Sequence, residues 1–494
     1  MKVLAFDFGA SSGRAILGEY TGKNLKLQEI HRFSNDPVMI NQVFYWDILR
    51  LFHEIKQGIQ KCVKAGHSDI SSISIDTWGV DFGLLDEYGN LLENPIHYRD
   101  ARFDDIMEKT FAKCSQNEIY EKTGIQFLKF NTIFQLDWLK QNRPEMLEKT
   151  SVMLMIPDLL SYFLTGVKNA EYTIASTTQL VNAESGNWDY DIINKLGINP
   201  KIFPEIIKTG SLKGKLLPDI AEELGIDQVD IIACASHDTA SAVVSAPLLK
   251  SENADDSVCS AYISCGTWSL LGAELSKPFI NEDSFSHNFT NEGGYSDTIR
   301  FLKNISGLWL LQETRKHWNS QGENISFKDI DKMLETAVSA NVYIDPDYPD
   351  FVSPGNIPQK INDFLKKTGQ KTLTDKGQLA LCILESLAMT YKYYILSMEK
   401  ILGKTVETVH LIGGGVQDRN LCQFTANSTQ KKVVAGPIEA TAIGNIAVQL
   451  ISKNAFEDMT QARQKLGDLE IFTSQNNEMW DKKYSEFLKY KNIK

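Results

Sequence analysis

The same short arrangement of residues occurs once in each half of this chain. Residues 3–8 predict a buried strand that runs into a loop of small residues, 9–13, and returns as a second strand over 15–20. Residues 261–271 repeat this order of strand, small-residue loop (264–267) and strand. Only the arrangement repeats, because few residues are identical between the two segments. The repeat indicates two related halves, each with a small-residue loop.

Strands and helices alternate along the rest of the chain. Further strands are predicted at 70–76, 80–86, 229–233 and 408–412. Helices are predicted at 48–63 and 377–402, where apolar residues recur at helical spacing. Such alternation is typical of α/β proteins. The chain of 494 residues is long enough for two or three domains, and the polar stretch 251–256 predicts a linker.

Composition argues against several classes of partner. The 51 Lys and Arg against 63 Asp and Glu give a formal net charge of −12, so nucleic acid and anionic membranes are poor partners. The seven cysteines are scattered without a C-x-x-C pair, which indicates reduced thiols. The first residues lack the long apolar stretch of a signal peptide. We expect a cytoplasmic protein that is a monomer or a small homo-oligomer.

The loop after the first strand is typical of phosphate binding. Its small residues let backbone N–H groups approach phosphate oxygens, and its hydroxyls add donors. The residues concerned are Ala10, Ser11, Ser12, Gly13 and Arg14. Asp7, at the end of the strand, is placed to hold Mg²⁺ through water. An ordinary hairpin turn rich in Gly and Ser is the alternative.

A second glycine loop lies at 413–415, between a predicted strand and a predicted helix. Three glycines permit the close approach of a flat or anionic ligand, and tight packing of the strand against the helix is the alternative. The loop does not match the dinucleotide pattern G-x-G-x-x-G, because Asp418 stands where the third glycine is needed. A nicotinamide cofactor is therefore disfavoured.

Ser236, His237, Asp238 and Thr239 follow the strand predicted at 229–233. Asp238 is a candidate general base. The alternatives are a hydrolase constellation that includes His237, and a simple cap for the helix that follows. His237 has no histidine partners at metal-ligand spacing, which argues against a metal site.

The segment 76–81, DTWGVD, is predicted to expose a tryptophan and two carboxylates around Gly79. Trp78 would then offer one apolar face beside fixed hydrogen-bonding groups, which suits a sugar. A packed tryptophan in a β-bulge, with Asp76 and Asp81 satisfied by the backbone, is the alternative. The two carboxylates also permit a glycoside hydrolase.

Taken together, these motifs resemble those of the FGGY carbohydrate kinase family, which includes glycerol kinase, xylulokinase and fuculokinase. They occur in one order over nearly the whole chain, which makes the resemblance highly specific. The segments that carry it are AFDFGASSGR (5–14), SIDTWGVDFGLLD (74–86), YRDAR (98–102), GIQFLKFNT (124–132), ASHDTASAV (235–243), SCGTWSLLG (264–272), NEGG (291–294), LKNISGLWLLQE (302–313), LIGGGVQD (411–418) and AGPIEATAIGN (435–445).

The resemblance implies an α/β fold of two actin-like and hexokinase-like (ribonuclease H-like) domains, each built on a mixed five-stranded sheet, with the active site in the cleft between them. Residues 1–245 would bind the sugar and hold the first phosphate loop, and residues 246–494 would bind the nucleotide. The implied ATP contacts are Ala10, Ser11, Ser12, Gly13, Arg14, Thr267, Gln312 and Gly414. The implied sugar contacts are Gly79, His237, Asp238, Thr239 and Asn304, beside Trp78.

The resemblance also implies an activity that depends on ATP and Mg²⁺. Asp238 would accept the proton of the attacking sugar hydroxyl, and Asp7 would hold Mg²⁺ through water. The implied reaction is phosphorylation of the 1-hydroxyl of L-rhamnulose, with a related deoxyketose or ketopentose such as L-fuculose or xylulose as the nearest competing substrate. A non-catalytic sensor of ATP or sugar on the same fold also fits these motifs, and a hydrolase that uses Asp76 and Asp81 fits them less well.

Overall fold

The computed structural model describes residues 1–248, 258–464 and 469–491, so the linker predicted at 251–256 lies outside the described residues. The chain divides into two compact units. The first unit contains Met1–Pro247, Glu274–Phe301 and Ala440–Leu466, and the second contains Leu248–Ala273, Leu302–Glu439 and Gly467–Lys494. The assignment of functional domains to 1–245 and 246–494 stays a prediction.

The first large sheet has six strands in the order β11-β12-β6-β1-β2-β3. They are β1 (Lys2–Phe8), β2 (Ser12–Tyr20), β3 (Leu25–Ser34), β6 (Ser72–Thr77), β11 (Leu212–Lys215) and β12 (Asp230–Ile232). Strand β1 pairs in parallel with β6 and antiparallel with β2. Its residues from Val3 to Phe8 are all buried, which confirms the buried strand predicted there.

The second large sheet has seven strands in the order β15-β16-β14-β13-β17-β18-β19. They are β13 (Val258–Cys265), β14 (Trp268–Leu275), β15 (Thr290–Gly293), β16 (Ile299–Ser306), β17 (Thr405–Ile412), β18 (Lys432–Ala435) and β19 (Glu470–Phe472). Strand β13 pairs in parallel with β17 and antiparallel with β14. The boundaries between the two units fall within β14 and β16.

The two sheets have the same order and directions around their hairpins. In the first, β12, β6 and β1 are parallel neighbours and β2 is antiparallel; in the second, β18, β17 and β13 are parallel neighbours and β14 is antiparallel. This common order confirms the repeat predicted from the sequence. The implied count of five strands in each sheet is wrong, because β11 and β19 add an antiparallel edge strand to each sheet and β15 extends the second.

Thirteen described helices and six short strands complete the first unit. The helices are α1 (Ile48–Lys64), α2 (Ile106–Phe111), α3 (Gln116–Thr123), α4 (Thr132–Asn142), α5 (Pro144–Lys149), α6 (Ile156–Thr165), α7 (Tyr172–Ser176), α8 (Tyr190–Lys195), α9 (Pro218–Leu224), α10 (Asp238–Ser245), α11 (Glu282–Ser286), α17 (Ala440–Ser452) and α18 (Met459–Arg463). The short strands are β4 (Val38–Ile40), β5 (Val43–Tyr45), β7 (Phe82–Leu85), β8 (Val152–Met155), β9 (Ala170–Glu171) and β10 (Ile206–Ile207).

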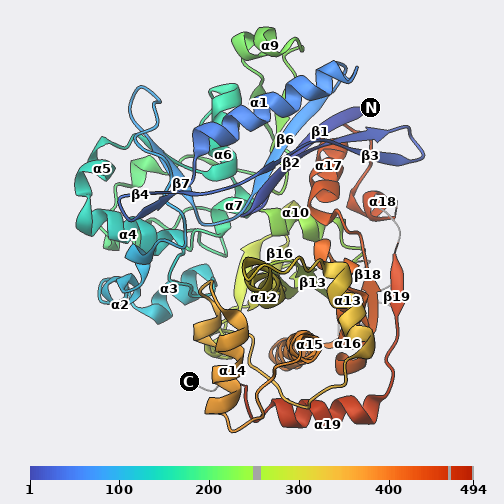
Figure 1. The fold of residues 1–494 in the computed structure, drawn as a ribbon. Coiled ribbons are helices and arrows are strands. Elements are labelled where there is room, and N and C mark those ends of the chain that lie inside the picture. The colour runs from blue at the N-terminus through green and yellow to red at the C-terminus, as the bar shows by residue number, and fades with distance from the viewer. Residues whose placement is uncertain (249–257, 465–468, 492–494) are drawn as a thin grey trace. The chain divides into compact units, whose positions relative to one another are not determined.

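Helix α17 comes from late in the chain but packs in the first unit, against β1, β6 and α10 (Figure 1). Its close contact with α10 depends on Gly444. A Cβ atom at this position would overlap the backbone carbonyl oxygen of Ser241 in α10. Glycine therefore allows α17 to lie directly against the helix that begins at Asp238.

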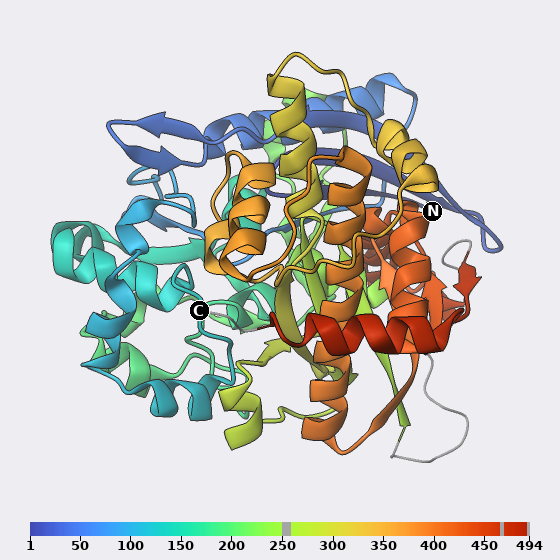
Figure 2. The same ribbon diagram turned by 60° about the horizontal axis from the view of Figure 1, so that its bottom comes forward.

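The second unit contains α12 (Trp309–Ser320), α13 (Phe327–Thr336), α14 (Ile357–Lys367), α15 (Lys376–Leu402), α16 (Arg419–Thr429) and α19 (Asn477–Phe487). Helix α15 packs against α13 and α16, and α19 lies across α15 and α16 (Figures 1 and 2). Among the described helices, α15 alone is long and apolar enough to cross a membrane, but 83% of its apolar window is buried inside the structure. It is the central core helix of this unit.

Candidate active site

Asn35 fixes the predicted phosphate loop of the first unit. Strand β2 begins at Ser12 rather than at residue 15, so the loop is shorter than predicted. The backbone N–H of Gly9 donates to the carbonyl oxygen of Ser12 (2.9 Å). Asn35 donates from its side chain to the Gly9 carbonyl (2.9 Å) and from its backbone to the Ser11 carbonyl (3.0 Å). Ala10 and Ser11 are exposed at the tip, where a phosphate needs access. No sequence motif marks Asn35.

Asp7 and Asp76 are parallel partners on β1 and β6, so their side chains share one face of the sheet. Arg14 donates to Asp7 (Nη2 to Oδ2, 2.6 Å), and Asn445 of α17 donates to Asp76 (Nδ2 to Oδ2, 2.6 Å). Burial and the charge of Asp7 raise the pKa of Asp76 well above its ordinary value, and Asp238 adds to this effect. The three carboxyl groups therefore lie close enough to interact electrostatically.

These carboxyl groups fit a hydrated Mg²⁺ ion. Oxygen ligands are those that Mg²⁺ prefers, and it usually keeps several waters. The ion pair between Asp7 and Arg14 favours contact through water over direct ligation. Asp76 Oδ1 is buried and has no hydrogen-bond partner among the described residues, so it is a further acceptor for such a water. Within the same residues, no group of three or more His, Cys, Asp and Glu side chains is arranged to hold a metal directly.

The predicted sugar segment is more buried than its sequence indicates. The side chains of Trp78 and Asp81 are 5% and 0% exposed, so the prediction that this segment exposes them is wrong. Asp81 accepts hydrogen bonds from the indole N–H groups of Trp46 (2.6 Å) and Trp78 (3.0 Å) and from Gln135 (2.9 Å). Trp46 also packs on Trp78, with 4.0 Å between ring centroids. Trp78 is packed, as the alternative interpretation expects, but side chains rather than the backbone supply most of the donors to Asp81.

The backbone between Trp78 and Asp81 is strained. Val80 has a φ of +66°, a left-handed conformation that β-branched residues rarely adopt. Thr177 holds it by accepting a hydrogen bond from the Val80 N–H (3.2 Å), and Thr132 donates to the Val80 carbonyl (2.7 Å). Gly79 lies against Thr177, whose Oγ1 would be 3.2 Å from an added Cβ. Strain held in this way is typical of ligand sites.

Asp81 is expected to make stability depend on pH. Burial raises the pKa of Asp81 to about 7, despite the hydrogen bonds from Gln135, Trp46 and Trp78. The folded chain therefore binds more protons at this site than the unfolded chain does, and stability falls as pH rises from about 4 to 7. The slope from this group is up to about 1.4 kcal/mol per pH unit. Urea unfolding at about pH 5 and pH 7 should show a smaller difference for Asp81→Asn than for the unchanged chain.

Asp86→Asn is the matched control for this measurement. Hydrogen bonds from Asn90 lower the pKa of Asp86, which is therefore already ionised at pH 5. Its substitution should leave the difference between the two pH values unchanged. Equal differences for Asp81→Asn and the unchanged chain would contradict the role assigned to Asp81.

Asp238 is the first residue of α10, and His237 occupies the N-cap position. The capping alternative for Asp238 is therefore wrong. The Asp238 carboxylate accepts hydrogen bonds from the backbone N–H (2.5 Å) and hydroxyl (3.1 Å) of Thr239, and its side chain is 30% exposed. The Thr77 N–H donates to the Ser236 carbonyl (2.9 Å), which places this segment beside the end of β6. The structure thus brings the predicted base beside the segment with Trp78 and Gly79.

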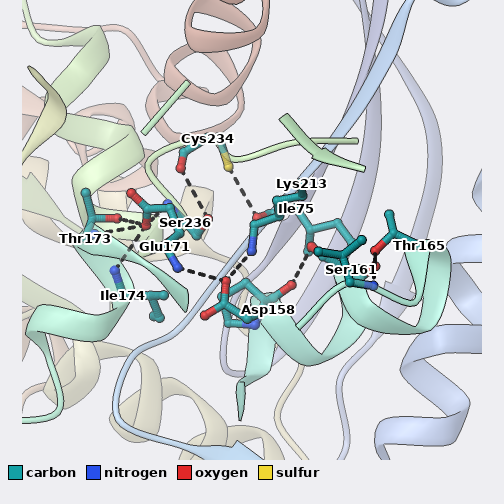
Figure 3. Close-up of polar contacts among 12 residues, drawn as sticks. Ile75, Asp158, Ser161, Thr165, Glu171, Thr173, Ile174, Lys213, Cys234 and Ser236 are labelled. Atoms are coloured by element: carbon teal, nitrogen blue, oxygen red, sulfur yellow. Dashed lines mark hydrogen bonds and ion pairs between the residues drawn. The ribbon is translucent and has the colours of Figure 1, made fainter. Parts of the chain in front are cut away.

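Glu171, at the end of β9, holds the backbone that precedes Asp238 (Figure 3). Its buried carboxylate accepts hydrogen bonds from the N–H groups of Ser236 (3.1 Å), Thr173 (3.0 Å) and Ile174 (3.2 Å). The hydroxyl of Thr209 donates to its other oxygen (2.5 Å). Sequence motifs missed Glu171, because its partners come from three separate segments of the chain.

A buried ion pair between Asp158 and Lys213 supports Glu171 (Figure 3). Asp158 accepts a hydrogen bond from the backbone N–H of Glu171 (3.2 Å). Burial raises the pKa of Asp158 to about 6, although Lys213 acts in the opposite direction. The pair and Glu171 form one continuous polar network behind the start of α10.

In the second unit, the loop between β13 and β14 lies at the start of α12. The Thr267 hydroxyl donates to the side-chain oxygen of Gln312 (3.1 Å), and the Thr267 carbonyl accepts from the Trp309 N–H (3.2 Å). Gly307 allows this approach, since an added Cβ would lie 2.7 Å from the Gly266 carbonyl oxygen. Two of the predicted ATP contacts, Thr267 and Gln312, are therefore in contact with each other.

The segment of three glycines at 413–415 lies against Cys265, beside the loop between β13 and β14. Gly413 has a φ of +86°, and Gly415 packs on Cys265, whose sulfur would lie 2.4 Å from an added Cβ. Gly414 has no atom within 4 Å of that position, so its surroundings are open. Tight packing explains Gly415, and Gly414 leaves room for a ligand. Asn304, predicted to bind sugar, lies on β16 in this unit.

Comparisons with solved structures identify the fold, and comparisons with known sequences identify the family. The fold resembles that of a ligand-bound xylulose kinase from Lactobacillus acidophilus (TM-score 0.81, 16% identity, 99% of this chain and 97% of that chain). It also resembles a glycerol kinase from Plasmodium falciparum with ADP (TM-score 0.79, 17% identity, 100% and 98%). These likenesses show the fold alone, and it is the fold class expected from the sequence.

The N-terminal domain of the FGGY family of carbohydrate kinases matches residues 2–245, and the C-terminal domain of that family matches residues 261–452. Proteins named rhamnulokinase are similar over nearly the full length. The one from Oceanobacillus iheyensis is 44% identical over 93% of this chain and 95% of its own. The one from Bacteroides thetaiotaomicron is 40% identical over 98% of each chain. The chain belongs to the FGGY family of carbohydrate kinases.

Proposed function

We propose that this chain is a rhamnulokinase, which transfers the γ-phosphoryl group of ATP to the 1-hydroxyl of L-rhamnulose and yields L-rhamnulose 1-phosphate and ADP. The observation that carries the proposal is the similarity to the rhamnulokinases named above, 44% and 40% identical over nearly the whole chain. The buried Trp78 segment and the partly exposed Asp238 at the start of α10 support it.

Asp238 is the general base in this proposal. Phosphoryl transfer needs the accepting hydroxyl in line with the γ-phosphate, and a carboxylate that takes its proton as attack proceeds. Thr239 binds Oδ1 of Asp238, and the side chain remains partly exposed, so a hydroxyl can reach it. Gly79, His237 and Thr239 of the first unit, and Asn304 of the second, are the proposed sugar contacts, and the buried Trp78 supports the segment that contains Gly79.

The two small-residue loops supply the phosphate contacts. In the first unit, the exposed tip at Ala10 and Ser11 and the start of β2 at Ser12, Gly13 and Arg14 present backbone and side-chain donors. In the second unit, Thr267, Gln312 and Gly414 would bind the nucleotide. Mg²⁺, when bound through water at Asp7, would neutralise charge on the phosphates. The cytoplasmic location and the monomeric or small homo-oligomeric state stay predictions.

A coupled assay of ADP release tests the substrate. With ATP and Mg²⁺ present, L-rhamnulose should give the highest kcat/KM among L-rhamnulose, L-fuculose, L-xylulose, D-xylulose, L-ribulose and glycerol. Preference for another ketose would overturn the proposed substrate, but the assignment as a sugar kinase would stand. Sugar-dependent closure without any ADP release would point to a sensor.

A further inference from the structure

His237 contacts a buried arginine on the side of its ring that faces away from Asp238. Arg300, on β16, is 0% exposed, and its Nη2 lies 3.1 Å from His237 Nδ1. The same Nη2 lies 3.0 Å from Glu292 Oε2, and Arg300 Nε donates to the Gly293 carbonyl (2.9 Å). The other ring nitrogen, Nε2, lies 3.4 Å from Asp238 Oδ1. All these residues belong to the first unit.

The chemistry of arginine decides which ring nitrogen carries the proton. A guanidinium group only donates hydrogen bonds, so its contact with Nδ1 is favourable only if Nδ1 presents a lone pair. The single proton of the neutral ring is then on Nε2, which faces Asp238. A doubly protonated ring would instead place the Nδ1–H against the guanidinium N–H, so that two donors and two cations would face each other in a buried contact.

We propose that Arg300 is a positioning residue that holds His237 in the neutral form protonated at Nε2. The Nε2–H group then points toward the Asp238 carboxylate and is available to a hydroxyl or carbonyl oxygen of the sugar. Because Asp238 is the base only under the function proposed above, the kinetic part of this role rests on that function. The protonation state of the ring does not.

The opposite assignment is that Glu292 holds a proton on Nδ1. Glu292 Oε2 lies 3.4 Å from His237 Nδ1, farther than the arginine. Burial raises the pKa of Glu292, and the positive charge of Arg300 lowers it. Glu292 Oε2 already lies 3.0 Å from Arg300 Nη2, in an ion pair that does not depend on a proton on His237. Asp238, Glu292 and Arg300 are the charged groups that face the imidazole, and Glu171 binds the backbone just before it.

Proton positions on the ring can be measured directly in the full chain. In protein labelled with ¹⁵N-histidine, long-range ¹H–¹⁵N spectra distinguish a protonated ring nitrogen from an unprotonated one. The chain has eight histidines, and loss of one set of signals in His237→Gln assigns His237. We expect an unprotonated Nδ1 and a protonated Nε2 at neutral pH. A protonated Nδ1, alone or in a doubly protonated ring, would overturn the proposal.

Two variants distinguish the effect of Arg300 on the His237 proton from that of Glu292. Glu292→Gln keeps the arginine and should leave the His237 signals in the same pattern. The double variant Arg300→Met with Glu292→Gln removes both charges together, so no unpaired charge stays buried, and should move part or all of the proton to Nδ1. If Glu292→Gln alone changes the pattern of the His237 signals, Glu292 determines the position of the ring proton, which would contradict the role of Arg300. If the double variant does not fold, the spectra of the unchanged chain and of Glu292→Gln still decide.

Kinetics test whether the protonation state matters for the sugar. In the double variant, KM for L-rhamnulose should rise roughly tenfold, as expected for one lost hydrogen bond, while KM for ATP stays unchanged. Equal rises in both KM values, or none, would overturn the positioning role. Absence of L-rhamnulose phosphorylation in the unchanged chain would instead overturn the proposed function, and the spectra would stand independently.

Discussion

Replacing Asp238 with asparagine is expected to lower kcat for L-rhamnulose by about 10²- to 10⁴-fold. An amide cannot take the proton of the attacking hydroxyl. Its oxygen can still accept the hydrogen bonds that Thr239 donates to Asp238 Oδ1, so the start of α10 should keep its conformation. Steady-state ADP release gives kcat, and thermal unfolding followed by circular dichroism shows whether the variant is folded.

Asp219→Asn is the matched control for this substitution. Asp219 is also an aspartate in the first turn of a helix of the first unit, α9, and it is exposed. Its substitution changes the same charge at the same kind of position and should leave kcat within twofold, roughly the scatter expected of surface changes. An unchanged kcat in Asp238→Asn, or an equal loss in both variants, would contradict the assignment of Asp238 as the base.

Replacing Glu171 with alanine is expected to have the largest effect on stability. The change leaves the buried N–H groups of Ser236, Thr173 and Ile174 without the carboxylate that accepts their hydrogen bonds. Each unpaired buried donor costs about 1–3 kcal/mol, so the free energy of unfolding should fall by about 3 kcal/mol or more. Urea unfolding measures this loss. Because Ser236 leads directly into α10, kcat should also fall in the folded fraction.

Thr209→Val provides the comparison within the same network. It removes one hydroxyl that donates to the other oxygen of the Glu171 carboxylate and leaves the three backbone donors paired. The expected loss is about 1 kcal/mol, the usual contribution of one hydrogen bond. If Glu171→Ala were no more destabilising than Thr209→Val, the carboxylate would not be what holds this backbone.

The hairpins and their loops could be predicted because their signals are local. Residues 3–6 of β1 and 261–263 of β13 are apolar and buried, and each strand is followed by small residues. Asp238 was also predictable, since it comes directly after the short strand β12 and a small-residue segment. The extra edge strands β11 and β19 carry no such pattern, because they are short and largely exposed.

Burial of the sugar segment could not be predicted from its own residues. Whether Trp78 is exposed depends on Asp81, whose donors Trp46 and Gln135 come from distant parts of the chain. The same holds for Glu171 and Arg300, because each acts on the segment around His237 only after separate segments have packed together. Sequence patterns identify residues whose role depends on their neighbours in the sequence. The structure is needed to find residues whose role depends on contacts with distant segments of the chain.

Identification of the reaction product tests the proposed function most directly. The full chain is incubated with ATP, Mg²⁺ and L-rhamnulose, and the sugar product is examined by phosphorus and carbon NMR. We expect one phosphomonoester, with phosphorus coupled to carbon 1 of the ketose, formed in equal amount to ADP. Phosphate on another carbon would contradict the proposed orientation of the sugar. ADP release with free phosphate and unchanged L-rhamnulose would contradict the assignment as a rhamnulokinase.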